Sequence, residues 1–238
     1  MLERLLEIER SSFLWLNSFH SPFTDQLMWL ISGNIAWIPL VFCFVLVLFL
    51  KNKKRWKEVL LLFLAIALVI ALCDQFSSTI CKPLFSRLRP THHPDFKDQV
   101  NTVFNYRSGQ YGFISGHATN AFGFVMLTTL IFKSRFYAIS LFTWAFVFAY
   151  SRIYLGVHFI SDIIPGIVAG LLIGWMVYSC YKRVYRSLFV VNSQNTEDNR
   201  QNFQGLNIVL YLLLATVFAM LIISFLYDQQ WITAITTK

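Results

Sequence analysis

Six runs of apolar residues, separated by polar connections, dominate the pattern of this chain. Four of the runs are long enough to cross a bilayer as helices, which takes about 20 residues, and two shorter runs need their polar flanks to complete a crossing. The runs are 26–50, 59–81, 118–132, 136–150, 163–181 and 206–227. No ten-residue segments alternate between apolar and polar residues, as barrel strands do. The pattern therefore predicts an all-α polytopic membrane protein with six transmembrane helices.

The first 20 residues carry a different pattern. Glu3, Glu7 and Glu9 stand among apolar residues at roughly helical spacing, which predicts an amphipathic helix lying in the membrane interface. A signal peptide has a basic start and an uninterrupted apolar stretch, and the glutamates exclude that assignment. We therefore expect an N-terminal interfacial helix before the six spans.

Composition agrees with a membrane protein. Of the 238 residues, 56% are hydrophobic and only 13% are charged, and the mean hydropathy is +0.56. These values lie outside the range of ordinary soluble domains.

The formal charge of +8 is unevenly distributed. Eleven of the 20 lysines and arginines lie in three connections, 51–57, 133–135 and 182–205, which six spans would place on one side of the membrane. By the positive-inside rule that side is cytoplasmic. The connections 82–116 and 152–162 then face outward, as do both ends of the chain. This distribution favours the lipid bilayer over nucleic acid as the partner of the basic residues.

Ionisable residues interrupt the apolar sequence between the fourth and fifth runs. Arg152, His158 and Asp162 stand there, at the membrane edge, where such side chains are costly enough to suggest function. His158 and Asp162 are four residues apart, which on a helix places them on one face. The carboxylate can then hold one imidazole nitrogen and leave the other free. The spacing predicts an oriented base or nucleophile.

The long connection 82–116 begins with a second polar motif. Lys82 and Arg89 offer an ammonium and a forked guanidinium, which suit an oxyanion such as phosphate. Taken alone, a basic cluster that contacts anionic headgroups is the simpler explanation.

The same connection ends in Ser115, Gly116 and His117, at the start of the third run. Backbone N–H groups at a helix N-terminus bind anions, although a capping serine beside an interfacial histidine is the simpler explanation of this triplet alone. All three motifs, however, are predicted to emerge on one face of the membrane. Together they supply three cations, two histidines and a carboxylate, as a phosphoryl transfer requires. His158 would attack phosphorus while His117 protonates the departing oxygen.

The ordered motifs resemble those of the type 2 phosphatidic acid phosphatases, membrane relatives of vanadium haloperoxidases and acid phosphatases. The first motif is Lys82-(six residues)-Arg89-Pro90, the second Ser115-Gly116-His117, and the third Ser151-Arg152-(five residues)-His158-(three residues)-Asp162. The family usually has a proline before the second motif, where this chain has Ile114. Proline there contributes rigidity and no chemistry.

The resemblance implies hydrolysis without a metal or other cofactor, through a covalent phosphohistidine at His158. Asp162 would orient this histidine, and His117 would protonate the leaving group. The implied phosphate contacts come from Lys82, Arg89, Ser115, Gly116 and Arg152.

We expect a single domain over residues 1–238, with an outward active-site loop at 82–117 and a cytoplasmic linker at 182–205. The expected substrate is a phosphorylated membrane lipid. Undecaprenyl diphosphate and lipid A are favoured, and phosphatidylglycerol phosphate and phosphatidic acid stay open. The expected location is a bacterial inner membrane, with the site facing the periplasm or exterior.

Two other classes of function compete with a lipid phosphatase. A transporter or flippase for an anionic lipid is opposed by the absence of an inverted repeat and by charges gathered on one face. An inactive scaffold is opposed by the complete motif set.

Three features of the sequence stay outside the motifs. Asp74 pairs with a cation or caps a helix. We expect His92 and His93 to lie in a solvated loop and not to form a metal site. Tyr106 contacts a substrate headgroup or anchors its loop at the interface.

Overall fold

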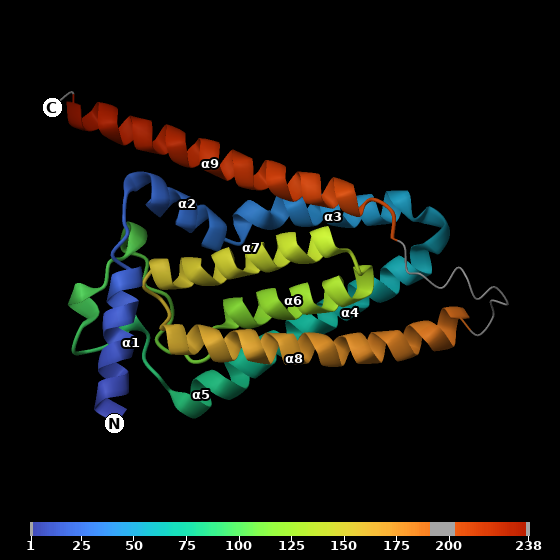
Figure 1. Ribbon diagram of the computed structural model, residues 1–238, viewed down its shortest axis with the longest axis horizontal. Helices are drawn as coiled ribbons and strands as arrows, with labels where there is room; N and C mark the ends of the chain where they lie inside the picture. The colour runs from blue at the N-terminus through green and yellow to red at the C-terminus, as the bar shows by residue number, and fades with distance from the viewer. Residues whose placement is uncertain (1, 191–202, 237–238) are drawn as a thin grey trace.

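The computed structural model describes residues 2–190 and 203–236, and this part of the chain is helical (Figure 1). The main helices are α1 (Leu2–Leu16), α2 (Pro22–Ser32), α3 (Ile38–Lys51), α4 (Trp56–Asp74), α6 (Gly116–Phe132), α7 (Arg135–Tyr154), α8 (Ile160–Tyr185) and α9 (Leu206–Thr236). Shorter segments are η1 (Ile35–Trp37), η2 (Lys53–Arg55), the π-helical η3 (Gln75–Cys81) and η7 (Arg186–Val190), α5 (Lys82–Phe85), η4 (Pro90–His92), η5 (Lys97–Gln99) and η6 (Val103–Asn105). Among the described residues the only β-type pairing is an isolated bridge between Leu88 and Tyr111. The prediction of an all-α protein is confirmed.

Four helical stretches are long and apolar enough to cross a membrane. They are Lys53–Phe85, Arg135–Tyr154, Ile160–Phe189 and Leu206–Gln230. The bent pair of α2 and α3 makes a fifth span if it is counted as one, and α6 is apolar but has only 17 residues. The structure thus describes a polytopic membrane protein with four or five spans, and the count of six stays a prediction.

The first apolar run is not the single helix that the sequence pattern suggests. α2 ends at Ser32 and α3 begins at Ile38, with the two helices bent by 71°. Gly33 has an extended conformation at the end of α2. Pro39 stands in the first turn of α3, where its missing N–H breaks no helical hydrogen bond. The bend brings Asn34 to the wall of a cavity that is lined by residues of α3, α4, α6 and α7.

The N-terminal segment is helical and crosses one end of the bundle as α1 (Figure 1). Phe13 is fully buried, with its ring 5.3 Å from that of Phe159. After the helix, the Asn17 amide donates to the carbonyl of Tyr154 at 2.7 Å and to that of Asn101 at 3.1 Å. α1 is therefore docked on the protein, and its place in the membrane interface stays a prediction.

The predicted linker 182–205 begins as helix, because α8 continues through Tyr185 and η7 through Val190. Its last residues are held by the side chain of Asn52, which bonds the backbone N–H of Gln204 at 3.0 Å and its carbonyl at 3.2 Å. The residues between, 191–202, lie outside the described part of the chain.

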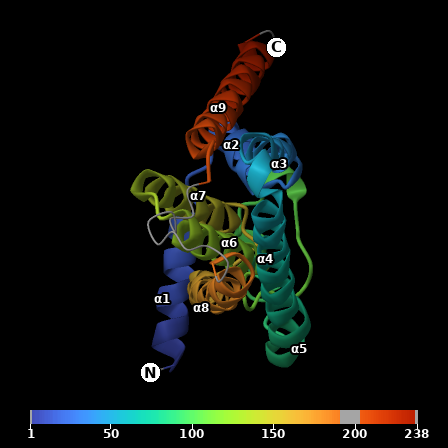
Figure 2. The same ribbon diagram turned by 90° about the vertical axis from the view of Figure 1, so that its right-hand side faces the viewer.

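α6 lies at the centre of the bundle, packed against α4, α7 and α8 (Figure 2). Gly166, Gly170 and Gly174 repeat at four-residue spacing along α8 and face α6. A Cβ at Gly170 would lie 2.4 Å from the backbone oxygen of Thr119, and one at Gly174 would lie 2.6 Å from that of Gly123. Small residues at this spacing let membrane helices bring their backbones together. Only glycine fits these positions without moving one helix.

The two ends of the bundle differ in their polar residues. Lys53, Lys133 and Arg183 lie near one end, where α3 meets α4, α6 meets α7, and α8 ends (Figure 1). α1 and the connection from α5 to α6 lie at the other end. The basic connections and the motif-bearing loop are therefore separated by the length of the bundle.

We predict that Gly170→Ala destabilises the protein by about 1–3 kcal/mol, because its methyl group would overlap the Thr119 carbonyl and force α6 and α8 apart. This overlap outweighs the roughly 0.5–1 kcal/mol that alanine gains over glycine within a helix. Thermal unfolding in detergent measures the effect. Gly109→Ala is the control, because nothing lies within 4 Å of a Cβ there. Equal melting temperatures for the two variants would contradict the packing argument.

Candidate active site

The second and third sequence motifs meet where α6 and α8 begin. Ser115 caps α6 and donates its backbone N–H to the carbonyl of Asp162, in the first turn of α8, at 3.0 Å. A Cβ at Gly166 would lie 2.9 Å from the Ser115 carbonyl oxygen. The close approach of the two helices therefore extends to this junction and fixes the two motifs against each other.

His158 lies in the turn between α7 and α8 and is 1% exposed. Its Nε2 lies 2.8 Å from Nη1 of Arg89, and its Nδ1 lies 3.4 Å from Oδ2 of Asp162. Because a guanidinium only donates, Nε2 is an acceptor, and the proton of the neutral ring is on Nδ1, facing Asp162. The turn itself requires Gly156, whose φ of +73° is one that side chains rarely adopt.

The protonation state of His158 follows from its surroundings. Burial, and then the positive charges of Arg89, Arg152 and Lys82, hold the pKa of His158 well below its usual value. The imidazole is therefore neutral at physiological pH, with a lone pair on Nε2.

Asp162 is fully buried and has three partners. Its Oδ2 accepts from the backbone N–H of Phe159 at 3.0 Å and faces His158. Its Oδ1 accepts from Nη1 of Arg87 at 3.0 Å, and Nη2 of Arg87 donates to Glu9 of α1 at 2.7 Å. Glu9 also accepts from the hydroxyl of Ser161. A chain of charges thus joins the N-terminal helix to the carboxylate that faces His158.

Arg87 and Glu9 were not identified by the sequence motifs. Arg87 is one of the six unspecified residues of the first motif, two positions before Arg89. Its guanidinium also lies over the ring of Phe159, at 4.6 Å from the centroid. The available signal was a buried carboxylate at Asp162 that needs a positive partner, and the sequence does not say which arginine supplies it.

Arg89 and Arg152 are 5% and 2% exposed, yet their donors are not all used. Arg152 bonds the hydroxyl of Ser32, and Arg89 bonds the carbonyl of Val157 at 3.0 Å in addition to His158. Nε of Arg89 and both Nε and Nη2 of Arg152 have no hydrogen-bond partner among the described residues. Burial, and then the charge of Arg152, lower the pKa of Arg89 to about 10. Buried donors of this kind are ready to receive an anion.

Lys82 brings the first motif to the start of α6. A Cβ at Gly116 would lie 3.9 Å from its Nζ, and Nζ is 3.3 Å from the hydroxyl of Ser78. A Cβ at Gly116 would also lie 3.0 Å from Oγ of Ser77. Glycine therefore keeps the first amides of α6 open to a ligand beside the lysine.

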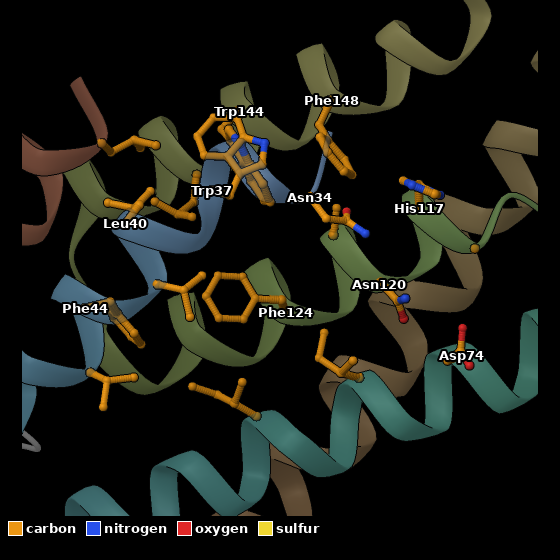
Figure 3. A pocket seen from close by; sticks show the side chains of 18 of the residues that line it. Asn34, Trp37, Leu40, Phe44, Asp74, His117, Asn120, Phe124, Trp144 and Phe148 are labelled. Carbon is orange, nitrogen blue, oxygen red and sulfur yellow. The ribbon is translucent and has the colours of Figure 1, made fainter. Parts of the chain in front are cut away.

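His117 projects from the first turn of α6 into a cavity of about 660 Å³ (Figure 3). Its ring lies 5.7 Å from that of Phe148. The positive charges of Arg152, Arg89 and Lys82 all act on it. The eight candidate residues from the three motifs therefore form one group at one end of the bundle.

The remaining polar residues of the loop have other partners. His92 lies 3.1 Å from the hydroxyl of Thr91, and His93 lies near Arg10 and Asp95. Among residues 2–190 and 203–236 no group of three or more His, Cys, Asp or Glu side chains is arranged to hold a metal. Unlike these two histidines, Tyr106 lies beside a residue of the motifs. The centroid of its ring is 6.0 Å from the guanidinium carbon of Arg152.

The three motifs lie in a region that matches a known protein family. The sequence profile of the PAP2 superfamily matches residues 58–186, which include all three motifs. A protein of Porphyromonas gingivalis named lipid A 4'-phosphatase is 47% identical over 180 residues, covering 76% of this chain and 75% of that protein. A protein of the same name from Bacteroides thetaiotaomicron is 37% identical over 179 residues, covering 75% and 79%.

Two solved structures share the fold. A crystal structure of LpxE from Aquifex aeolicus has a TM-score of 0.54 and 24% identity, covering 72% of this chain and 95% of that one. A PAP2-type phosphatidylglycerolphosphate phosphatase from Bacillus subtilis has a TM-score of 0.57 and 21% identity, covering 77% and 89%. The sequence profile covers more than half of the chain, and the motifs that it spans are assembled in the fold. The chain belongs to the PAP2 superfamily.

Proposed function

We propose that this protein removes phosphate from a membrane lipid, with lipid A phosphate as the favoured substrate. The observation that carries the proposal is that Nε of Arg89 and Nε of Arg152, both buried, have no hydrogen-bond partner in the described part of the chain and lie next to a neutral histidine. An oxyanion supplies the missing acceptors. The curated relatives, at 47% and 37% identity, are both named lipid A 4'-phosphatase, which supports this choice among lipid phosphates.

The phosphate binds between the three cations and the first amides of α6. Lys82, Arg89 and Arg152 surround its equatorial oxygens, and the N–H groups of Ser115 and Gly116 donate to it. These charges stabilise the negative charge that spreads over the oxygens during phosphoryl transfer. They take the electrostatic role that a metal has in other phosphatases.

Binding also frees the nucleophile. In the empty site the guanidinium of Arg89 donates a hydrogen bond to the lone pair on Nε2 of His158. When a phosphate binds, this guanidinium donates to the phosphate oxygens instead. Nε2 then attacks phosphorus and forms the P–N bond while the P–O bond to the lipid breaks. His117 takes up a proton when the negatively charged phosphate binds beside it, and it gives this proton to the departing oxygen.

The second half of the reaction releases phosphate. A water molecule attacks the phosphohistidine, His117 takes its proton, and the P–N bond breaks to return neutral His158. Asp162 accepts the Nδ1 proton of His158 in a hydrogen bond throughout, which stabilises the positive charge that the ring acquires. Arg87 holds this carboxylate in place from its other oxygen.

We further propose that six helices cross a bacterial inner membrane, with α2 and α3 as one bent span, α6 as a short one, and α1 in the interface. The site then lies at headgroup depth on the periplasmic face. The basic connections at the opposite end of the bundle support this orientation. The gathering of the ionisable groups at one end disfavours a transport path, which needs them near the midplane.

We expect His158→Ala to lower phosphate release from lipid A by roughly 10³-fold or more, because the variant lacks the nucleophile. Phosphate release by purified protein in detergent measures this, and size-exclusion chromatography checks the fold. His93→Ala is the matched control, because this loop histidine contacts Arg10 and Asp95 instead of the site. Normal activity in His158→Ala would exclude the mechanism.

Activity is expected to persist in excess EDTA, because the arginines and Lys82 supply the positive charge. Vanadate, which adopts the five-coordinate geometry of the transition state, is expected to inhibit. Phosphate release with EDTA, with EDTA and added magnesium, and with vanadate gives the comparison. A strict requirement for magnesium would refute the cationic site.

Arg87→Met is expected to lower kcat by about 10- to 100-fold with little change in KM, because Asp162 loses the partner that positions it and the phosphate contacts remain. Partial recovery in Arg87→Lys would distinguish positioning from general instability. Arg183→Met, at the other end of α8, is the control. Loss of substrate affinity without loss of kcat would assign Arg87 to binding.

A further inference from the structure

The cavity that receives His117 continues from the phosphate site deep into the bundle. Lys82, Gly116 and His117 line the part of the cavity at the phosphate site, and Phe44, Phe63, Phe124 and Leu213 line an apolar part that we call its apolar depth. Because one cavity joins the phosphate contacts to an apolar interior, its occupant is the lipid part of the substrate that binds at the site. The inference below rests on the proposed function and adds what that lipid must carry.

Polar groups stand between the phosphate site and the apolar depth. Figure 3 shows Asn120 of α6 and Asp74 of α4 in the space between these helices, and both residues line the same cavity as His117. Oδ1 of Asn120 is buried and has no hydrogen-bond partner among the described residues. Among the described residues the side chain of Asp74 accepts one long hydrogen bond, of 3.4 Å, from Ser78. A carboxylate inside a membrane-spanning helix is costly enough to require a partner.

The position of these two residues fixes the part of the ligand that they meet. Asn120 is four residues beyond Gly116, one helical turn or about 6 Å deeper than the phosphate contact. Asp74 is eight residues before Lys82, roughly two turns deeper. Both therefore lie beyond the phosphate contacts, on the way to the apolar residues of the cavity.

Their chemistry fixes the kind of group. The carboxylate of Asp74 and the free Oδ1 of Asn120 are acceptors, so they require donors on the ligand. A polyprenyl chain has no donors, and the ester groups of a diacylglycerol only accept. Hydroxyl and amide N–H groups donate, and an acylated sugar phosphate such as lipid A carries them next to its phosphate.

We infer that Asp74 and Asn120 form a donor-recognising subsite that selects lipids whose phosphate is attached to a hydroxylated, amide-bearing group. This subsite distinguishes a phosphorylated glycolipid from phosphatidic acid and from undecaprenyl diphosphate. Asp74 also interacts by charge with Lys82. That interaction is the same for every phosphate substrate, whereas the subsite distinguishes one lipid from another.

The test is the ratio of kcat/KM for lipid A to kcat/KM for phosphatidic acid. Asn120→Leu keeps the side-chain size and removes the acceptor, so we expect this ratio to fall about 10-fold or more, with activity on phosphatidic acid retained. Asp74→Leu is expected to lower the ratio in the same direction. It is the second variant in case Asn120→Leu does not fold, because Asp74 is exposed to the cavity. Gly109→Ala is the control and should leave the ratio unchanged, because residue 109 does not line the cavity and nothing lies within 4 Å of a Cβ there.

The outcomes separate the two proposals. A wild-type protein that releases phosphate from no lipid would overturn the proposed function itself. If the wild type cleaves both lipids and the two variants lose activity on both equally, Asn120 and Asp74 are structural and the subsite is excluded. If the wild-type protein prefers phosphatidic acid, the subsite is excluded, but the proposed function as a lipid phosphatase still holds.

Discussion

The backbone contact between α6 and α8 is the constraint on which the site depends. Gly166 and Gly170 let the two helices approach closely, and the hydrogen bond from Ser115 to Asp162 ties their first turns together. A membrane gives helices no hydrophobic reason to associate, so close packing and backbone contact supply the order. Two helix N-termini, whose partial positive charges favour anions, are thereby set side by side.

The contact also explains how the protein holds several buried charges close together. Arg89, Arg152 and Lys82 repel one another, and they remain in place because each is tethered by its own element and by hydrogen bonds to Val157, Ser32 and Ser78. Such a site is unfavourable when empty and favourable when an anion neutralises it. The rigid helices around it provide the free energy that keeps it assembled.

The sequence predicted much of this site because its chemistry is local. The spacing of His158 and Asp162, and the order of the three motifs, singled out the eight residues that the fold brings together at one end of the bundle. Arg87 and Glu9 were missed because their pairing joins segments that are 78 residues apart, and no periodicity encodes such a contact. The bend at Gly33 was missed because an apolar run does not reveal an extended residue within it. The four-residue spacing of the glycines in α8 is visible in the sequence, but the sequence does not show that α6 is the helix that packs against them.

The hydrogen bond from Arg89 to His158 has a consequence for the working cycle. In the proposed mechanism the nucleophile is shielded, while the site is empty, by the same guanidinium that the substrate recruits. Inorganic phosphate, the released product, is itself an anion that can accept from the same donors. A phosphate bound in the site would therefore compete with the lipid for this guanidinium, so the phosphate concentration on the side of the membrane that the site faces would affect the rate.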